Sequence, residues 1–182
     1  MIVEDQHIEH IIEACKQQDI KAQEALYRSY YKAMMNLCIR YTNNDTDAMS
    51  ALNMGFLKVF KNIQRYDSTK ATLYTWIRTV VINSCLDYIK INKQQPYQEI
   101  NDVHDIQIEP EVISKMKEGV ILDLVKKLPP ATQAVFNLYI MEGYSHKEIA
   151  ALLHISEGTS KWHLSEAKKT LKTQIISNNI LE

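Results

Sequence analysis

The sequence predicts an all-α protein made of two small helical domains joined by a flexible acidic linker. Glycine and proline together account for only eight of the 182 residues, which argues against the many turns of a β sandwich or barrel. Apolar residues recur every three or four positions over several long stretches, as they do along one side of an α-helix. The sign of the charge also changes along the chain, and these changes mark the expected division into domains.

The charge pattern places the two domains at residues 1–95 and 114–182. Each of these ranges has a net charge of +2, whereas residues 96–113 contain five acidic residues and no lysine or arginine. The middle stretch also contains Pro96 and Pro110 and shows no sustained helical periodicity. It is therefore predicted to be a linker.

Three long helices are expected in the first domain, at residues 21–42, 46–64 and 71–92. Asn44 can end the first helix and cap the second, and the polar stretch 63–70 separates the second from the third. The second helix is apolar over more of its surface than one buried face requires. It is therefore either central to the bundle or docks a partner with its second face.

The third helix is predicted to bury one apolar stripe, in which Trp76 is expected to belong to the core. The stripe comprises Leu73, Trp76, Ile77, Val80, Ser84, Tyr88 and Ile91. The other side of this helix offers polar side chains, among them Arg78 and Asn83. An asparagine amide can hydrogen-bond to base edges, although Asn83 can equally be an ordinary surface amide.

The second domain is predicted to contain a helix-turn-helix motif. Residues 128–130, Leu-Pro-Pro, suit the start of a helix, and Gly143 suits its end. Ser145 and Glu148 then have the spacing of a capping box, and Ser156 is a good N-cap for the last helix. Two helices with a tight turn and a basic outer face are typical of DNA readers, while a plain helical hairpin is the alternative.

The formal net charge of −1 conceals two basic segments. Residues 58–93 contain seven basic and two acidic residues, and residues 159–173 contain four lysines and one glutamate. A basic run is often only a solvated helix face, but these two adjoin the motifs described above. They therefore favour contact with nucleic acid.

No pattern typical of an enzyme is found. The four glycines are isolated, so there is no phosphate-binding loop, and His7 and His10 are expected to be surface residues. The three cysteines, too widely spaced for a redox or zinc motif, are expected to be buried thiols in a reducing cytosol. With no signal-like or membrane-spanning run of apolar residues, we expect a cytoplasmic protein without catalytic residues, metal or cofactor.

The segment from Leu128 to Lys172 resembles region four of sigma factors of the extracytoplasmic-function type. The matching elements are Leu128-Pro129, Gly143-x-Ser145, Glu148-Ile149-Ala150 and Ile155-Ser156-Glu157-Gly158-Thr159. Residues 48–60 resemble the helix of region two that docks RNA polymerase. The pattern that follows is similar to the helix that opens and reads the minus-ten element, and it consists of Trp76, Arg78, Asn83, Asp87, Tyr88 and Lys90.

The resemblance implies a bacterial sigma factor that binds the β and β′ subunits of core RNA polymerase and directs initiation at promoter DNA. The implied polymerase contacts are Met49, Asn53, Met54 and Leu57. The implied minus-ten contacts are Arg65, Lys70, Arg78, Asn83, Lys90 and Lys93. The implied minus-thirty-five contacts are Glu157, Thr159, Lys161, Trp162, His163, Lys168 and Lys169. The family also implies a partner of the anti-sigma class, often membrane-bound.

The sequence departs from the family in the docking helix. The family pattern is close to Ala-Glu-Asp-x-x-Gln-Glu, whereas residues 48–54 read Ala-Met-Ser-Ala-Leu-Asn-Met. Polar coupling to the polymerase is therefore expected to be weaker or replaced by apolar contact. Two alternatives stay open, namely a helix-turn-helix regulator that works without polymerase and a degenerate sigma-like interaction protein that does not open promoters.

Overall fold

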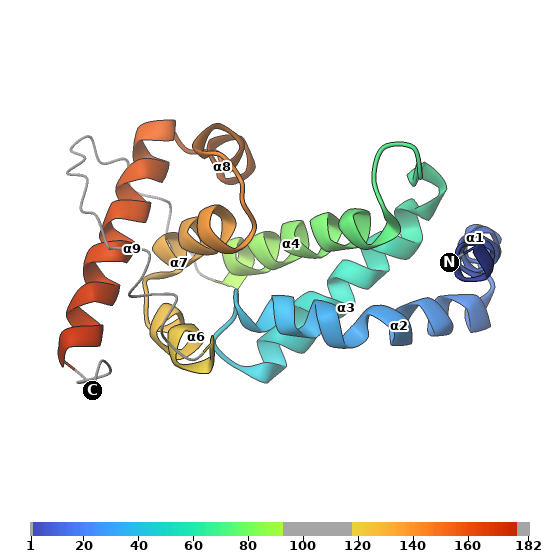
Figure 1. Ribbon diagram of the computed structural model, residues 1–182, viewed down its shortest axis with the longest axis horizontal. Coiled ribbons are helices and arrows are strands. Elements are labelled where there is room, and N and C mark those ends of the chain that lie inside the picture. The colour runs from blue at the N-terminus through green and yellow to red at the C-terminus, as the bar shows by residue number, and fades with distance from the viewer. Residues whose placement is uncertain (1, 93–117, 178–182) are drawn as a thin grey trace. The chain divides into compact units, whose positions relative to one another are not determined.

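The computed structural model describes residues 2–92 and 118–177, in which the regular elements are all helices (Figure 1). The Cα positions divide the chain into two compact units, separated between Tyr88 and Ile89. The all-α class predicted from the sequence is confirmed for the described residues. Each unit has its own apolar core.

The acidic segment 96–113, expected to be a linker, lies outside the described residues. The domain boundaries 1–95 and 114–182 therefore stay predictions.

The first unit is a bundle of four helices and one short turn. They are α1 (Ile2–Lys16), α2 (Ile20–Ile39), α3 (Asp45–Asn62), the 3-10 turn η1 (Ile63–Arg65) and α4 (Leu73–Asn92). The three helices expected here are confirmed, with ends shifted by up to three residues, whereas α1 was not assigned from the sequence. The predicted cap is also confirmed, because the Asn44 side chain accepts a hydrogen bond from the Asp47 backbone N–H at 2.8 Å.

Helix α3 buries one stripe and leaves its other side at the surface. The buried positions are Ala48, Ala51, Leu52, Gly55, Phe56 and Val59, three or four residues apart. Leu57 lies outside this stripe and is 70% exposed, while Met49 and Met54 are half-buried. One side of α3 is therefore packed in the bundle, and Leu57 with the two methionines leaves apolar surface on the other side. Docking of a partner on that surface stays a prediction.

The apolar stripe predicted for α4 needs a correction. Val80 is only half-buried, and its neighbour Val81 is fully buried instead. The reason is local, because Val81 packs directly against Gly55 of α3, where the missing side chain lets the two helices approach. Trp76 is half-buried and not wholly in the core. Tyr88 is half-buried too, and its hydroxyl donates to the Asp47 carboxylate at 2.8 Å.

The second unit consists of four helices and one turn of π-helix. They are α6 (Glu118–Lys126), α7 (Pro130–Phe136), the π turn η2 (Asn137–Met141), α8 (His146–Leu153) and α9 (Glu157–Ser177). Pro130 opens α7 at a position where no intrahelical N–H is needed. Gly143 has a φ of 76°, a left-handed conformation that suits glycine and ends the helical run, as predicted.

Helix α9 is the centre of the second unit and packs against α6, α7 and α8. The four apolar residues predicted to be buried on it are confirmed, and they are Leu164, Ala167, Leu171 and Ile175. Because three helices surround α9, it also buries polar side chains, including Ser160 and Ser165. More of the surface of α9 is thus buried than its apolar residues alone indicate.

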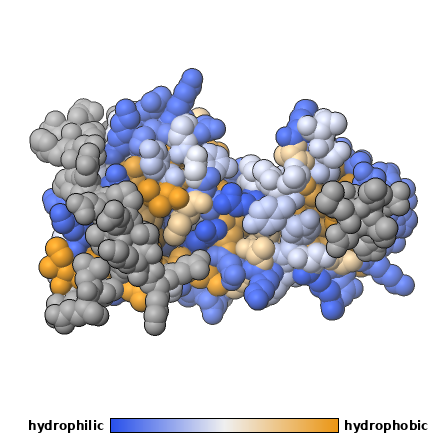
Figure 2. Space-filling model, viewed as in Figure 1, coloured by the Kyte–Doolittle hydropathy of each residue, from blue (hydrophilic) through white to orange (hydrophobic). Residues whose placement is uncertain are grey.

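The surface of the described residues is largely hydrophilic on the face drawn in Figure 2, with separate small hydrophobic areas. The large apolar side chains that remain exposed are Ile20, Leu57, Tyr74, Tyr139, Ile140 and Ile176. Most single exposed apolar residues need no functional explanation. Leu57 differs because it lies beside the half-buried Met54 on the outer face of α3.

Candidate nucleic-acid interface

The turn between α8 and α9 has the geometry of a helix-turn-helix. Ser145 caps α8 in a complete capping box with Glu148, and the hydrogen bonds from Ser145 lower the pKa of that carboxyl group. His154 then adopts a left-handed conformation, with φ 57°, which ends α8. Ser156 caps α9, its hydroxyl accepting from the Thr159 N–H at 3.0 Å. These local features fix the angle at which α9 leaves the turn.

A second contact holds the two helices of the motif together. The His146 imidazole on α8 and the Ser160 hydroxyl on α9 form a hydrogen bond of 2.9 Å. Ser160 is fully buried, and His146 also stacks on Tyr139 of η2 with ring centroids 4.5 Å apart. The pKa of His146 is lowered mainly by burial and, to a lesser extent, by the charge of Lys161. Both effects favour the neutral ring in this contact.

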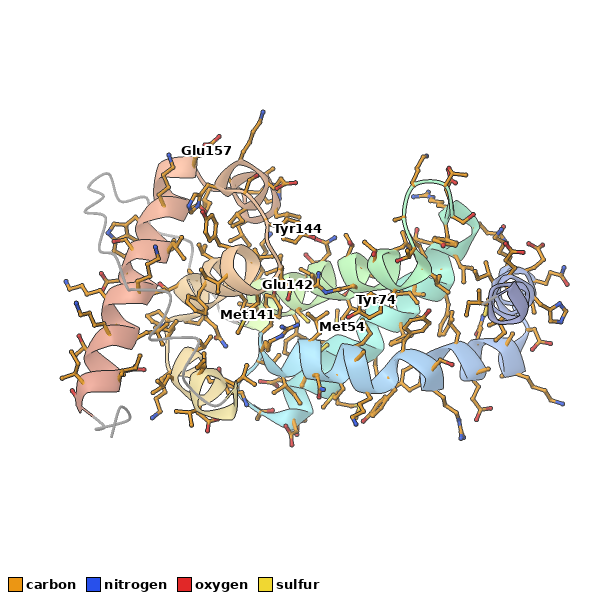
Figure 3. All side chains as sticks on the ribbon, in the orientation of Figure 1. Met54, Tyr74, Met141, Glu142, Tyr144 and Glu157 are labelled. Atoms are coloured by element: carbon orange, nitrogen blue, oxygen red, sulfur yellow. The ribbon has the colours of Figure 1, made fainter. Side chains whose placement is uncertain are left out.

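The first turns of α9 present a mixed set of side chains to solvent. Glu157 projects from the first turn (Figure 3), and Lys161 is exposed one turn later. Trp162 is half-buried and lies edge-on to the His163 ring, with centroids 4.9 Å apart. Farther along, Lys169 is exposed and Lys168 is half-buried. A ligand beside α9 could therefore contact five side chains, namely Glu157, Lys161, Trp162, Lys168 and Lys169.

Two residues predicted to read DNA are placed elsewhere by the structure. Thr159 is 1% exposed, and its hydroxyl is hydrogen-bonded to that of Ser156 at 2.8 Å. His163 is 5% exposed, and its Nδ1 lies 3.0 Å from the Thr132 hydroxyl of α7. Burial lowers the pKa of His163 to about 4. Both side chains are buried in the second unit, so we do not retain them among the residues expected to contact bases.

In the first unit, the basic residues predicted to meet DNA are not all in one place. Arg65 is exposed on η1 and Lys90 is exposed near the end of α4. Asn83 precedes Lys90 by seven residues and therefore lies on the same side of α4, whereas Arg78, five residues before Asn83, faces a different side. Lys93 lies outside the described residues.

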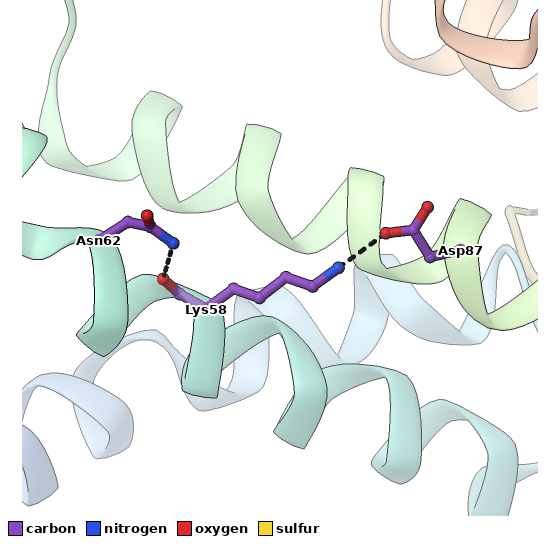
Figure 4. A network of polar contacts seen from close by, with 3 residues as sticks. All are labelled: Lys58, Asn62 and Asp87. Atoms are coloured by element: carbon purple, nitrogen blue, oxygen red, sulfur yellow. Dashed lines mark hydrogen bonds and ion pairs between the residues drawn. The ribbon is translucent and has the colours of Figure 1, made fainter.

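Two of the lysines in the basic segment are paired with carboxylates. Lys70 lies 3.4 Å from Asp67, whose pKa is lowered chiefly by hydrogen bonds from Thr69 and then by Lys70 itself. The Lys58 ammonium donates to the Asp87 carboxylate at 2.7 Å and joins α3 to α4 (Figure 4). The charge that remains for phosphate is therefore smaller than the sequence count suggests.

Aromatic side chains gather around the loop between η1 and α4. The rings of Tyr66 and Trp76 are 5.4 Å apart, and the Tyr66 hydroxyl donates to the Ala71 carbonyl at 3.2 Å. The rings of Tyr30 and Tyr74 are 6.3 Å apart, and Tyr74 is 45% exposed at the start of α4 (Figure 3). Sequence reasoning considered Trp76 alone here. The concentration of aromatic residues around a basic loop was the signal that could have identified the tyrosines.

The predicted polymerase contacts share the outer face of α3. Asn53 and Leu57 are exposed one turn apart, and the half-buried Met49 and Met54 are their neighbours along the helix. Met54 is labelled in Figure 3. Asn53 also accepts a hydrogen bond from the Tyr27 hydroxyl of α2 at 3.1 Å. The face thus presents apolar side chains and one oriented amide, and sequence reasoning did not include Tyr27.

Neither a metal site nor a membrane-spanning helix is present in the described parts of the chain. Within residues 2–92 and 118–177, no three histidine, cysteine, aspartate or glutamate side chains come together as metal ligands would. Over the same ranges, no helix is both long enough and apolar enough to cross a membrane. The cysteines Cys15, Cys38 and Cys85 are buried free thiols, as predicted.

The two units match two known families in chain order. Residues 26–94 match the family described as Sigma-70 region 2, and residues 118–171 match Sigma-70, region 4. A curated relative, the ECF RNA polymerase sigma-E factor of Haemophilus influenzae, is 22% identical over 178 residues, covering 91% of this chain and 93% of its own. The chain belongs to the extracytoplasmic-function sigma factors.

Other relatives and solved structures agree with this family. The ECF RNA polymerase sigma factor SigM of Mycobacterium tuberculosis is 26% identical over 156 residues, which is 84% of this chain and 76% of SigM. The sigma factor RpoE of Bartonella quintana, solved in complex with the anti-sigma factor NepR, is 15% identical with a TM-score of 0.55, covering 86% of this chain and 98% of that one. CnrH, solved with the cytosolic domain of CnrY, is 14% identical with a TM-score of 0.51, covering 92% and 96%. These two structures share the fold of this sigma factor.

Proposed function

We propose that this sigma factor binds core RNA polymerase and directs it to promoters by reading a minus-ten and a minus-thirty-five element. The observation that carries the proposal is the α8–turn–α9 motif, in which caps at Ser145 and Ser156 hold α9 so that Glu157 and Lys161 are exposed at its first turns. A recognition helix contacts base edges with its N-terminal residues. The match of the first unit to region 2 supplies the second half of the proposal.

At the minus-thirty-five element, α9 would enter the major groove. Glu157, Lys161 and Trp162 are the side chains near its N-terminus with access to base edges. Lys168 and Lys169 lie two turns farther on and would contact phosphate, which positions the protein but does not specify sequence. The N–H groups of Glu157 and Gly158, which precede the capped Thr159 N–H in the first turn of α9, would favour a phosphate there as well.

At the minus-ten element, η1, the loop after it and α4 would bind the opened strand. Arg65 and Lys90 are exposed for backbone phosphate, and Asn83 is half-buried on the same side of α4 as Lys90. Tyr66 and Trp76 pack against each other beside the loop, where aromatic rings can stack on unpaired bases. Lys70, paired with Asp67, would contribute less than its charge suggests.

Docking to the polymerase would use the outer face of α3. Leu57 is the one large apolar side chain of α3 that is exposed, and the carboxylates that the family pattern places nearby are replaced by Met49, Ser50 and Met54. Burying apolar surface is worth roughly 25 cal/mol per Å², so this face can bind without ion pairs. We propose that apolar contact takes the place of the missing charges in this chain.

The charge balance fits a protein that reads DNA together with a polymerase. With a net charge of −1, and with Lys58 and Lys70 paired internally, the free chain has no overall positive charge to attract phosphate. Phosphate contacts dominate affinity for DNA and make it depend on salt. The isolated sigma factor is therefore expected to bind DNA weakly and with a steep salt dependence.

The proposed role requires no catalytic group in this chain and places it in the cytoplasm, where the polymerase acts. The Bartonella quintana RpoE was solved with the anti-sigma factor NepR, and CnrH was solved with the cytosolic domain of CnrY. We propose that this chain is likewise held by an anti-sigma factor, and that core polymerase competes with that factor for the sigma units.

Retention of core RNA polymerase from the organism that encodes this chain tests the proposal. The tagged full chain should retain the β and β′ subunits from a lysate treated with nuclease, so that DNA cannot bridge the two. Absence of the β and β′ subunits from the retained material, together with tight binding of added promoter DNA by the purified chain, would contradict the proposal and favour a helix-turn-helix regulator.

A further inference from the structure

A hydrogen bond between helices fixes the one amide on the outer face of α3. The Tyr27 hydroxyl of α2 donates to Asn53 Oδ1 of α3 at 3.1 Å. Asn53 is exposed, whereas Tyr27 is half-buried. An exposed asparagine without such a partner rotates freely about its side-chain bonds, so this bond selects one orientation of the amide.

The tyrosine that makes this bond is itself held firmly. Its ring lies edge-on to Phe56, with centroids 4.7 Å apart, and tilted against Tyr31 at 5.7 Å. Phe56 is 2% exposed and belongs to the core. The pKa of Tyr27 is raised mainly by burial and, to a lesser extent, by the neighbouring Tyr31 and Cys38. Its hydroxyl therefore remains a donor at physiological pH.

The orientation decides which atoms of Asn53 face solvent. With Oδ1 accepting from Tyr27, the Nδ2 group keeps its two N–H donors for another molecule. The bordering side chains Met49, Met54 and Leu57 have no nitrogen or oxygen atoms that could compete. The nearby Ser50 hydroxyl is already bonded to the Thr46 carbonyl at 2.9 Å.

We propose that Tyr27 is a positioning residue for polymerase docking, which holds the Asn53 amide so that its N–H groups donate to an oxygen atom of core RNA polymerase. The inference rests on the proposed function and deepens it, because it names the polar chemistry of an otherwise apolar docking face. The partner atom is a carbonyl or carboxylate oxygen.

A double-mutant cycle on the full chain tests this role, with affinity for core RNA polymerase as the readout. The variants are Tyr27→Phe, Asn53→Ala and the two combined. Loss of one well-made hydrogen bond corresponds to roughly a tenfold change in affinity, so Asn53→Ala should weaken binding about tenfold. Tyr27→Phe keeps the ring packing and should weaken binding several-fold in the wild-type background but not in the Asn53→Ala background.

Two further variants separate positioning from a structural effect. Asn53→Asp keeps the acceptor for Tyr27 but removes the N–H donors, so it should bind polymerase as poorly as Asn53→Ala without loss of thermal stability. Tyr31→Phe is the matched control, since its hydroxyl is not hydrogen-bonded to any described residue, and it should bind like the wild type.

The outcomes distinguish this inference from the proposed function. Additive effects of Tyr27→Phe and Asn53→Ala, or wild-type affinity of Asn53→Asp, would overturn the role of Tyr27 while polymerase binding by the wild type still stood. Failure of the wild-type chain to bind core polymerase would overturn the proposed function and this inference with it.

Discussion

Gly55 of α3 lies directly against Val81 of α4, in a contact that leaves no room for a side chain. A Cβ atom at Gly55 would lie 3.0 Å from Val81 Cγ2 and 3.3 Å from Val81 Cα. Glycine in the middle of a helix costs about 1 kcal/mol relative to alanine. The close approach of α3 and α4 explains why the sequence has glycine at this position.

Gly55→Ala is expected to destabilise the first unit despite the better helix propensity of alanine. Adding a methyl group to a closely packed contact typically costs about 2 kcal/mol. Replacing glycine by alanine in a helix gains about 1 kcal/mol from helix propensity. The net loss should therefore be about 1 kcal/mol. Urea unfolding measures it through Trp76, in a Trp162→Phe background that leaves Trp76 as the sole tryptophan.

The matched control is Gly119→Ala in α6, where a Cβ atom would meet nothing within 4 Å. This change should stabilise the second unit by about 0.5–1 kcal/mol. A Gly55→Ala protein with equal or higher stability would contradict the close packing of α3 on α4.

The features that the sequence predicted well are those encoded locally. The helix-turn-helix could be predicted from Ser145, Glu148 and Ser156, because helix capping depends on residues only three positions apart. Gly143 likewise marks the end of a helix by its own conformational freedom.

The features that the sequence missed depend on contacts between helices. Thr159 and His163 are polar and occupy the recognition helix, but α9 is enclosed by three neighbours that bury them. Val81 and not Val80 is buried because it packs against Gly55, which has no side chain. Gly55 lies on another helix, so the periodicity of α4 alone does not indicate this contact. The Tyr27–Asn53 bond joins residues 26 positions apart, which the sequence pattern did not link.

Acid is expected to destabilise the second unit through His163. The pKa of this buried histidine is about 4 in the folded protein, compared with about 6.5 when unfolded. As the pH falls from 6.5 toward 4, the unfolded chain therefore binds a proton that the folded chain does not. The free energy of unfolding should fall with a slope of up to about 1.4 kcal/mol per pH unit. This contribution levels off below pH 4.

The comparison of wild type with His163→Gln measures this contribution. The variant should show a smaller loss of stability between pH 6.5 and pH 4 than the wild type does, in urea unfolding followed through Trp162. Equal pH profiles for wild type and His163→Gln would show that His163 is not buried as a neutral ring.

Leu57→Ser is expected to weaken polymerase binding without unfolding the first unit. The side chain is 70% exposed, so its loss should change stability by about 0.5 kcal/mol or less. Binding would bury it, and losing that burial is worth about 1.5–3 kcal/mol, or a tenfold loss of affinity or more. Binding of purified core polymerase measures it, with Ile20→Ser as a control that changes another exposed apolar residue. Unchanged affinity would place the docking face elsewhere.

The double variant Lys161→Ala, Lys168→Ala is expected to lose promoter-dependent transcription while still binding core polymerase. Removing two phosphate or base contacts should lower the salt dependence of promoter binding by about two in log–log slope. Lys127→Ala, an exposed change outside α9 in the same unit, is the control. Normal transcription by the double variant would refute the assignment of α9 as the reader of DNA.

Transcription by reconstituted polymerase tests the central proposal most directly. Core RNA polymerase of the organism that encodes this chain is combined with the purified chain on genomic DNA, and the 5′ ends of the transcripts are sequenced. A promoter-specific sigma factor should give a limited set of start sites that share two conserved elements upstream, near minus ten and minus thirty-five. These start sites should disappear when the chain is omitted. The same start sites with and without the chain, or no shared elements, would contradict its role as a promoter-specific sigma factor.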